Sequence, residues 1–150
     1  MYLLENGSIN AMSSYNRLVL SGIPSLVVEG IAVSQAIQGK GFFKDVTEIA
    51  RSNEAVICLR TQNPFMYRAL EKYCSYIYPG QNRMPVAVKA IQDDLASHLS
   101  CGIDEQGVIK GFYEGLFYGE KPVHRFVSPL FEKLGMDVNN GDAVLAIGIK

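Results

Sequence analysis

The chain has 150 residues, of which 48% are hydrophobic and 19% are charged, and its formal net charge is −1. A globular chain of this length buries roughly 68–70% of the surface that its unfolded form exposes, so one domain over 1–150 needs no disulfide or metal to fold. Fourteen Lys and Arg residues against fifteen Asp and Glu residues leave no basic excess to neutralise phosphates, which argues against nucleic-acid binding. The longest apolar run, 23–33, is interrupted by Glu29 and is shorter than the ~20 residues of a membrane-spanning helix.

The cysteines and the first residues predict a cytoplasmic protein. Cys58, Cys74 and Cys101 are odd in number, widely spaced and never in a Cys-x-x-Cys arrangement, which indicates reduced thiols rather than disulfides or a metal site. Residues 1–5 lack the basic start and the long apolar stretch of a signal peptide. We therefore expect no export, no membrane association and no metal.

The first half of the chain, 1–74, predicts alternating strands and helices. Its expected elements are a hairpin of 2–6 and 9–20 around Asn-Gly-Ser, a buried strand over 25–33, an amphipathic helix over 42–51, a buried strand over 55–61 and a helix from 64 to about 74. Gly22-Ile23-Pro24 is expected to interrupt the chain before the third strand. This order is typical of an α/β domain with a helical crossover between two parallel strands.

The second half, 75–150, is less regular. It predicts a turn at 79–82, a helix over 86–99, a loosely alternating strand over 108–118, a short helix from Ser128-Pro129 to Gly135, and a terminal strand over 143–149 within the sheet. Aromatic side chains that could line a pocket or an interface gather here, with core packing as the alternative: Tyr76, Tyr78, Phe112, Tyr113, Phe117 and Tyr118.

A glycine-containing stretch, Gln38-Gly39-Lys40-Gly41, stands between the predicted third strand and the first helix. Backbone N–H groups and the helix dipole converge in such a loop, which makes it a candidate anion site. A P-loop is excluded because Lys40 is followed by glycine, and a dinucleotide fingerprint is excluded because its third glycine would fall at Lys44. The alternative is that the two glycines only supply a tight turn.

The stretch from Val33 to Phe43 resembles the pyrophosphate loop of the GNAT acetyltransferases, whose pattern is Gln/Arg-x-x-Gly-x-Gly/Ala. Gln38 and Gly41 match this pattern, while Phe43 stands where the pattern has a small residue. The order of elements over 25–74 also agrees, so the resemblance covers about half the chain. It implies a GNAT-like α/β fold, with a mixed, mostly antiparallel sheet and a parallel, splayed central strand pair flanked by helices.

The resemblance also implies an acetyl-CoA or other acyl-CoA co-substrate and transfer of its acyl group to an amine of a small molecule or peptide. The pantetheine chain would lie between the splayed strands, and the loop backbone would hold the pyrophosphate. Asn63 touches the cofactor in this reading, although Asn63-Pro64 is also a complete helix-start signal, with asparagine as N-cap. The implied cofactor-binding residues are Ile31, Ala32, Val33, Gln38, Gly39, Lys40, Gly41, Phe42, Phe43 and Asn63.

Glu29 and Tyr67 are the candidate catalytic residues. Glu29 is the only ionisable residue in 25–33, and strand alternation places it with Val27 and Ile31 on one face, partly removed from water, as a general base requires. Its alternatives are an exposed cleft wall or an ion pair with Arg60. The family often has an acid tyrosine at the position of Leu70, so Tyr67, one turn earlier, is the nearest candidate, and core packing is its alternative.

The chain departs from the family pattern at both ends. Only a hairpin precedes the cofactor strand, and the acceptor-side half, 75–150, is long. We expect residues within 76–125, or the same region of a second subunit in a homodimer, to cover the acetyl end of the groove. Two further functions stay open, namely an acyl-CoA-binding module without catalysis and an interaction subunit without a ligand.

Overall fold

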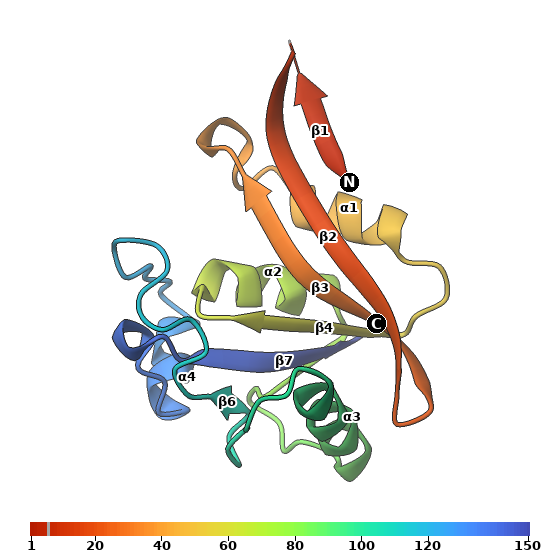
Figure 1. Ribbon diagram of the computed structural model, residues 1–150, viewed down its shortest axis with the longest axis vertical. Helices are drawn as coiled ribbons and strands as arrows, with labels where there is room; N and C mark the ends of the chain where they lie inside the picture. The colour runs from red at the N-terminus through yellow and green to blue at the C-terminus, as the bar shows by residue number, and fades with distance from the viewer. Residues whose placement is uncertain (6) are drawn as a thin grey trace.

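The computed structural model describes residues 1–5 and 7–150, which form a mixed seven-stranded sheet with helices packed on both faces (Figure 1). The strand order is β1-β2-β3-β4-β7-β5, and β6 pairs separately with β7. The elements are β1 (Tyr2–Glu5), β2 (Ser8–Leu20), β3 (Ile23–Val33), α1 (Phe42–Ala50), β4 (Val56–Thr61), α2 (Pro64–Tyr73), β5 (Tyr76–Tyr78), α3 (Val86–His98), β6 (Val108–Ile109), α4 (Ser128–Lys133) and β7 (Ala143–Ile149), with 3-10 turns at Gln35–Ile37 and Val138–Asn140.

Within the described sheet, β3 and β4 are the one parallel pair, and every other pairing is antiparallel. The connection between them runs through α1, which confirms the predicted crossover. The terminal strand β7 lies between β4 and β5, so the predicted place of the last strand within the sheet is also confirmed.

Two apolar clusters lie on the two faces of the sheet, because successive side chains of a strand point in opposite directions. On one face, Leu26 and Ile57 pack with α1, α2 and α4, and on the other, Val27 and Cys58 pack with α3. Coverage of both faces explains why 25–33, 55–61 and 143–149 are nearly continuous apolar runs rather than alternating ones.

Most predicted elements are confirmed to within one or two residues: the hairpin, both helices of the first half, the strand over 55–61, the helix over 86–99, the short helix from Ser128 and the terminal strand. Asn6 of the predicted hairpin turn lies outside the described residues. The predicted interruption at 22–24 is wrong in extent, since β3 begins at Ile23 and Pro24 pairs with Val19. The turn is confined to Ser21 and Gly22, both with positive φ.

The predicted strand over 108–118 is wrong beyond its first two residues. Only Val108 and Ile109 pair with β7. Gly111 and Glu114 then adopt positive φ values of 61° and 59°, which no strand allows, so the alternating residues that follow belong to a folded loop. The short strand β5 was missed, because three residues carry too little alternation to be recognised.

Asp142 ties this loop to the start of β7. Its buried carboxylate accepts hydrogen bonds from the backbone N–H of Gly111 and of Asp137, each at 2.9 Å, and from Lys110 Nζ at 2.9 Å. Burial raises the pKa of this carboxyl, but the hydrogen bonds and the lysine charge outweigh it and hold the pKa below its usual 3.8.

We predict that Asp142→Asn lowers the free energy of unfolding by roughly 1.5–3 kcal/mol, the usual size of hydrogen bonds to a charged group. Because the pKa is lower in the folded state, this stability is present above about pH 4 and is lost as the pH falls through the folded pKa. Urea denaturation between pH 2.5 and 7 measures the effect, with Glu105→Gln at an exposed carboxylate as control. A difference between wild type and variant that persists at the lowest pH would contradict it.

Candidate functional site

The parallel pairing of β3 and β4 stops while both strands continue. Ser25 to Val28 pair with Val56 to Leu59, and no further pair joins the two strands in the described chain. β3 nevertheless extends to Val33 and β4 to Thr61, and Figure 1 shows their ends diverging. Residues 31–33, the predicted pantetheine-binding residues, therefore pair with β2 on one edge, while their other edge, toward β4, has no partner in the described sheet.

A β-bulge stands where this divergence begins. In the pairing of β2 with β3, Val28 faces Tyr15 and Gly30 faces Ser14, so Glu29 is the extra residue. A bulge bends its strand and increases the local twist, which turns the end of β3 away from β4. It also overturns the predicted alternation, because Ile31 packs against the α1 and α2 face whereas Val27 packs on the α3 face.

The Glu29 carboxylate pairs with Arg60 of β4. Arg60 Nη1 donates to Glu29 Oε2 at 2.9 Å, and the two side chains are 30% (Glu29) and 18% (Arg60) exposed. The Arg60 guanidinium stands 5.2 Å from the centre of the Phe112 ring, and the Tyr113 hydroxyl donates to the Arg60 carbonyl at 3.4 Å. The alternative reading of Glu29 as an ion-pair partner is thus confirmed, and its carboxylate still reaches solvent.

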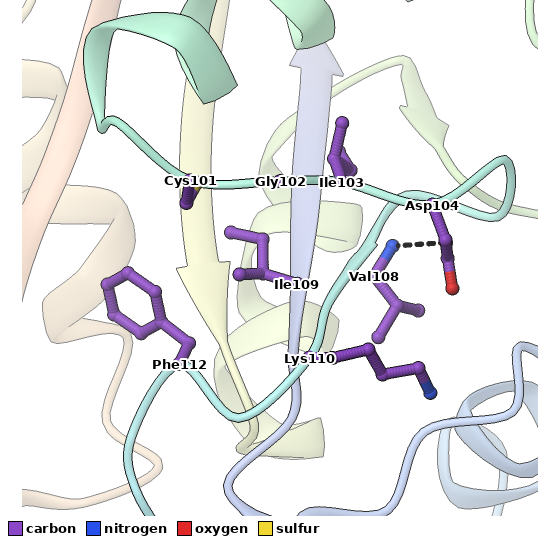
Figure 2. A pocket seen from close by; sticks show the side chains of 8 residues that line it. All are labelled: Cys101, Gly102, Ile103, Asp104, Val108, Ile109, Lys110 and Phe112. Carbon is purple, nitrogen blue, oxygen red and sulfur yellow. Dashed lines mark hydrogen bonds between the residues drawn. The ribbon is translucent and has the colours of Figure 1, made fainter.

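Next to this ion pair lies an open depression, the Phe112 pocket, and of the aromatic residues that the sequence marked as candidates for lining a pocket, Phe112 lines this one. Figure 2 shows two stretches of chain on either side of it, one from Cys101 to Asp104 and one from Val108 to Phe112. It is lined by Cys101, Gly102, Ile103, Asp104, Val108, Ile109, Lys110 and Phe112. Phe112, which belongs to the segment 76–125, thus stands beside Arg60, the partner of Glu29.

The glycine loop at the end of β3 is closed by its own hydrogen bonds. Gln38 Nε2 donates to the Val33 carbonyl at 3.1 Å, and the Lys40 amide donates to the Ile37 carbonyl at 3.4 Å. Gly39 and Gly41 have φ values of 76° and 88°, which favour glycine. Among the described residues, no atom outside their immediate chain neighbours comes within 4 Å of a Cβ built at either glycine, so the surface of the loop is open.

Gly41 is the N-cap of α1, and no side chain caps this helix. The first N–H groups of an α-helix have no partner within the helix, and the helix dipole is positive at this end. Lys40 is exposed beside them. The loop therefore presents backbone donors and positive charge at the far end of the free β3 edge.

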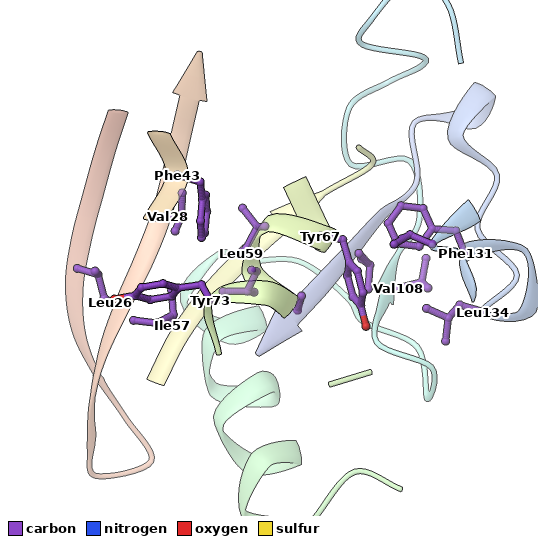
Figure 3. Close-up of a cluster of buried hydrophobic side chains, with 14 residues drawn as sticks. Leu26, Val28, Phe43, Ile57, Leu59, Tyr67, Tyr73, Val108, Phe131 and Leu134 are labelled. Atoms are coloured by element: carbon purple, nitrogen blue, oxygen red, sulfur yellow. The ribbon is translucent and has the colours of Figure 1, made fainter. Parts of the chain in front are cut away.

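Phe43 belongs to the core rather than to the loop surface. It is buried and meets the Tyr73 ring edge to face, with ring centres 6.1 Å apart, and Figure 3 shows it beside Val28 in the cluster under α1. Phe42, the residue before it, is partly exposed. The large residue that departs from the family pattern is thus accommodated by pointing into the core.

Asn63 caps α2, as predicted from Asn63-Pro64. Its Oδ1 accepts from the Phe65 amide at 2.9 Å, and it directly follows β4 on the diverging side. Burial raises the pKa of the Tyr118 hydroxyl, and hydrogen bonds with Asn63 and Thr61 oppose that rise. Polar groups of Thr61, Asn63 and Tyr118 therefore meet at the end of β4, with Tyr118 coming from the loop after β6.

Tyr67 is a core residue in this structure. Its side chain is 1% exposed, its hydroxyl donates to the Pro79 carbonyl, and its ring meets Phe131 with centres 5.6 Å apart (Figure 3). Burial, with a smaller contribution from Glu71, raises the pKa of the hydroxyl strongly. Tyr67 packs on the face of the sheet that α1 and α2 cover. Arg60, the partner of Glu29, stands beside Phe112, which packs on the opposite face with α3, so the structure does not bring Tyr67 to Glu29.

Comparisons with protein-family models, with curated proteins and with solved structures found no match to the chain. Within residues 1–5 and 7–150, no group of three or more His, Cys, Asp or Glu side chains stands close enough to hold a metal ion. No helix in that part of the chain is long and apolar enough to cross a membrane. The three cysteines are free thiols, as expected.

We predict that Tyr67→Phe lowers the free energy of unfolding by about 1–3 kcal/mol, because it leaves the buried Pro79 carbonyl without its donor. Urea denaturation measures the change. Tyr76→Phe, at an exposed tyrosine, is the matched control and should leave stability unchanged. Equal stability of Tyr67→Phe and wild type would show that this hydrogen bond does not hold the turn at Pro79.

Proposed function

We propose that the chain binds an acyl-CoA, acetyl-CoA being the simplest, between the diverging ends of β3 and β4 and transfers its acyl group to an amine. The observation that carries this proposal is the end of parallel pairing at Val28 and Leu59, directly before the bulge. An extended ligand with amide groups can hydrogen-bond to such a free strand edge as an added strand does. A mixed sheet that is antiparallel apart from one parallel pair in the described chain also supports the proposal.

The free edge and the glycine loop are arranged in the order that an acyl-CoA requires. From Glu29 to Val33 the strand spans roughly 13 Å, at about 3.3 Å per residue, which suits an extended pantetheine arm with two amides. The open loop of Gly39 and Gly41 and the uncapped start of α1 follow on the same segment, where a pyrophosphate would meet backbone donors. Val28 and Gly30, on either side of Glu29, supply the backbone nearest the thioester.

Acyl transfer needs a deprotonated amine, and Glu29 is the base in this proposal. The carboxylate takes one proton from the acceptor ammonium, and the amine nitrogen then forms a bond to the thioester carbonyl carbon. The carbon–sulfur bond breaks with its electron pair leaving on sulfur, and the second proton of the nitrogen is passed to the thiolate or to water. Tyr67, buried against Pro79, has no part in this scheme.

An acyl-CoA-binding module without catalysis is the second candidate. The ion pair of Glu29 with Arg60 favours it, since the arginine occupies one oxygen of the carboxylate that would have to act as the base. The burial of Tyr67 favours it too, because no general acid is then provided by α2. Binding of CoA without release of CoA in the presence of amines distinguishes this module from an enzyme, and absence of binding leaves the interaction subunit.

We predict that millimolar acetyl-CoA or CoA raises the melting temperature by several degrees, since a ligand at a hundred times its Kd stabilises the native state by about 2.7 kcal/mol. Gly41→Glu should abolish this shift, because it places a carboxylate beside the phosphates. Gly41→Gln imposes the same backbone strain without the charge and should retain at least part of the shift. Equal shifts in both variants would place the phosphates elsewhere.

We predict that Glu29→Gln lowers the rate of amine-dependent CoA release by roughly a hundredfold, the usual size of a general-base contribution. The shift in melting temperature caused by CoA should persist, because the pyrophosphate loop is untouched. Glu132→Gln, at an exposed glutamate, is the control for loss of one negative charge. An unchanged rate would remove Glu29 from the mechanism.

A further inference from the structure

We infer that the acyl acceptor is a free α-amino acid with an apolar side chain, bound where the Glu29–Arg60 ion pair borders the Phe112 pocket. This inference rests on the proposed function, because it assigns the second substrate of that site. Three features carry it: the position of the ion pair, the unused hydrogen-bonding capacity of its two members, and the apolar lining of the pocket.

The ion pair is shared by the strand opening and the pocket. Glu29 is the bulge residue at which β3 and β4 part, and its partner Arg60 stands 5.2 Å from the ring centre of Phe112. A second residue of the lining is also near, since the charge of Arg60 opposes the rise that burial causes in the pKa of the Cys101 thiol. A ligand at the Phe112 edge of the pocket therefore lies next to the ion pair, at the place where the thioester is expected.

The two members of the pair keep free groups for a ligand. One guanidinium nitrogen of Arg60, Nη1, donates to Glu29, and no other side chain in the described part of the chain accepts from this arginine. The Arg60 guanidinium carbon lies over the Phe112 ring, and the ring takes none of its N–H groups as a hydrogen-bond acceptor would, so the remaining donors can bind a carboxylate. Glu29 uses only Oε2 in the pair, so Oε1 can accept from an ammonium.

The two charged residues that line the Phe112 pocket, Asp104 and Lys110, each make contacts within the protein. Asp104 Oδ1 accepts from the backbone amides of Gln106 and Val108, each at 2.9 Å, and the second of these bonds is drawn in Figure 2. Lys110 Nζ binds Asp142 at 2.9 Å and the Gly135 carbonyl at 2.6 Å. Glu29 and Arg60 place one carboxylate and one guanidinium side by side, which complement the ammonium and carboxylate on the α-carbon of an amino acid.

The rest of the lining is apolar. Val108 and Ile109 are buried, and Cys101, Ile103 and Phe112 are half-buried around them. An apolar acceptor side chain would release water from these surfaces, whereas a charged one would exchange its hydration for apolar contacts there. The amino acid therefore carries its charges at the ion pair and its side chain toward Phe112.

The experiment measures CoA release from acetyl-CoA with four compounds: L-phenylalanine, phenethylamine, which lacks the carboxylate, L-glutamate, and 3-phenylpropionate, which lacks the amine. We expect kcat/KM for L-phenylalanine to exceed that for phenethylamine by about ten- to a hundredfold, the usual range for hydrogen bonds to a charged group. L-Glutamate should react more slowly than L-phenylalanine. 3-Phenylpropionate should inhibit in competition with L-phenylalanine and release no CoA.

Arg60→Gln tests the assignment of the carboxylate. The ratio of kcat/KM for L-phenylalanine to that for phenethylamine should fall by about ten- to a hundredfold, and this ratio is insensitive to a general loss of activity. Arg83→Gln, at an exposed arginine outside the Phe112 pocket, should keep the wild-type ratio. If Arg60→Gln does not fold, Arg60→Lys, which keeps the charge but loses the fork of donors, should lower the ratio to a smaller extent.

Equal use of phenethylamine and L-phenylalanine by the wild type, or an unchanged ratio in Arg60→Gln, overturns the assignment of a free amino acid. Equal kcat/KM values for L-glutamate and L-phenylalanine overturn the assignment of an apolar side chain to the acceptor. In each case a melting shift with CoA and release of CoA by any amine leave the proposed function standing. Absence of both overturns the proposed function, and this inference with it.

Discussion

The arrangement of the candidate site depends on one interruption of the sheet, the bulge at Glu29. Up to Val28 the third strand is held on both sides, by β2 and by β4. The extra residue changes the direction and twist of the strand, so pairing with β4 ends although pairing with β2 continues to Val33. Backbone groups that a regular strand would satisfy within the sheet become available for a ligand, and the loop that follows is carried away from β4.

The bulge also decides which side chains share the site. A regular strand would have kept Glu29, Val27 and Ile31 on one face, whereas Ile31 packs on the α1 and α2 face and Glu29 reaches Arg60. Arg60 comes from the stretch of β4 that continues past the last parallel pair, so the two charges meet across the beginning of the opening. Both side chains of this ion pair are partly exposed, which leaves them accessible from solvent.

The second half of the chain contributes Phe112 and Tyr113 beside Arg60. β7 pairs with β4, and Asp142 directly precedes β7. The Asp142 carboxylate accepts a hydrogen bond from the Gly111 amide and so holds the start of the loop. From that anchor Phe112 extends to Arg60, and Tyr113 donates to the Arg60 carbonyl. Segments far apart in sequence, β3, β4 and the loop after β6, thus contribute to one small region.

Local signals in the sequence determined the elements and the loop. Apolar periodicity placed both helices of the first half and the strands over 25–33 and 55–61, Asn63-Pro64 gave the start of α2, and the glycines marked the turn into α1. These features depend on neighbours within a few residues, so the sequence reveals them. The sequence left open whether Glu29 pairs with Arg60 or lines an exposed cleft, because the alternation of side chains along a strand does not reveal a bulge.

The tertiary structure decided which of these residues meet. Tyr67 and Phe43 have spacings that suit either a site or a core, and only packing against Phe131 and Tyr73 assigns them to the core. The sequence predicted Phe112 and Tyr113 as parts of a strand. In the structure, Gly111 and Glu114 have positive φ angles, and both aromatic residues lie in a loop beside Arg60. Contacts between segments fifty residues apart depend on the register of the sheet and on the closure of loops, and no local pattern encodes them.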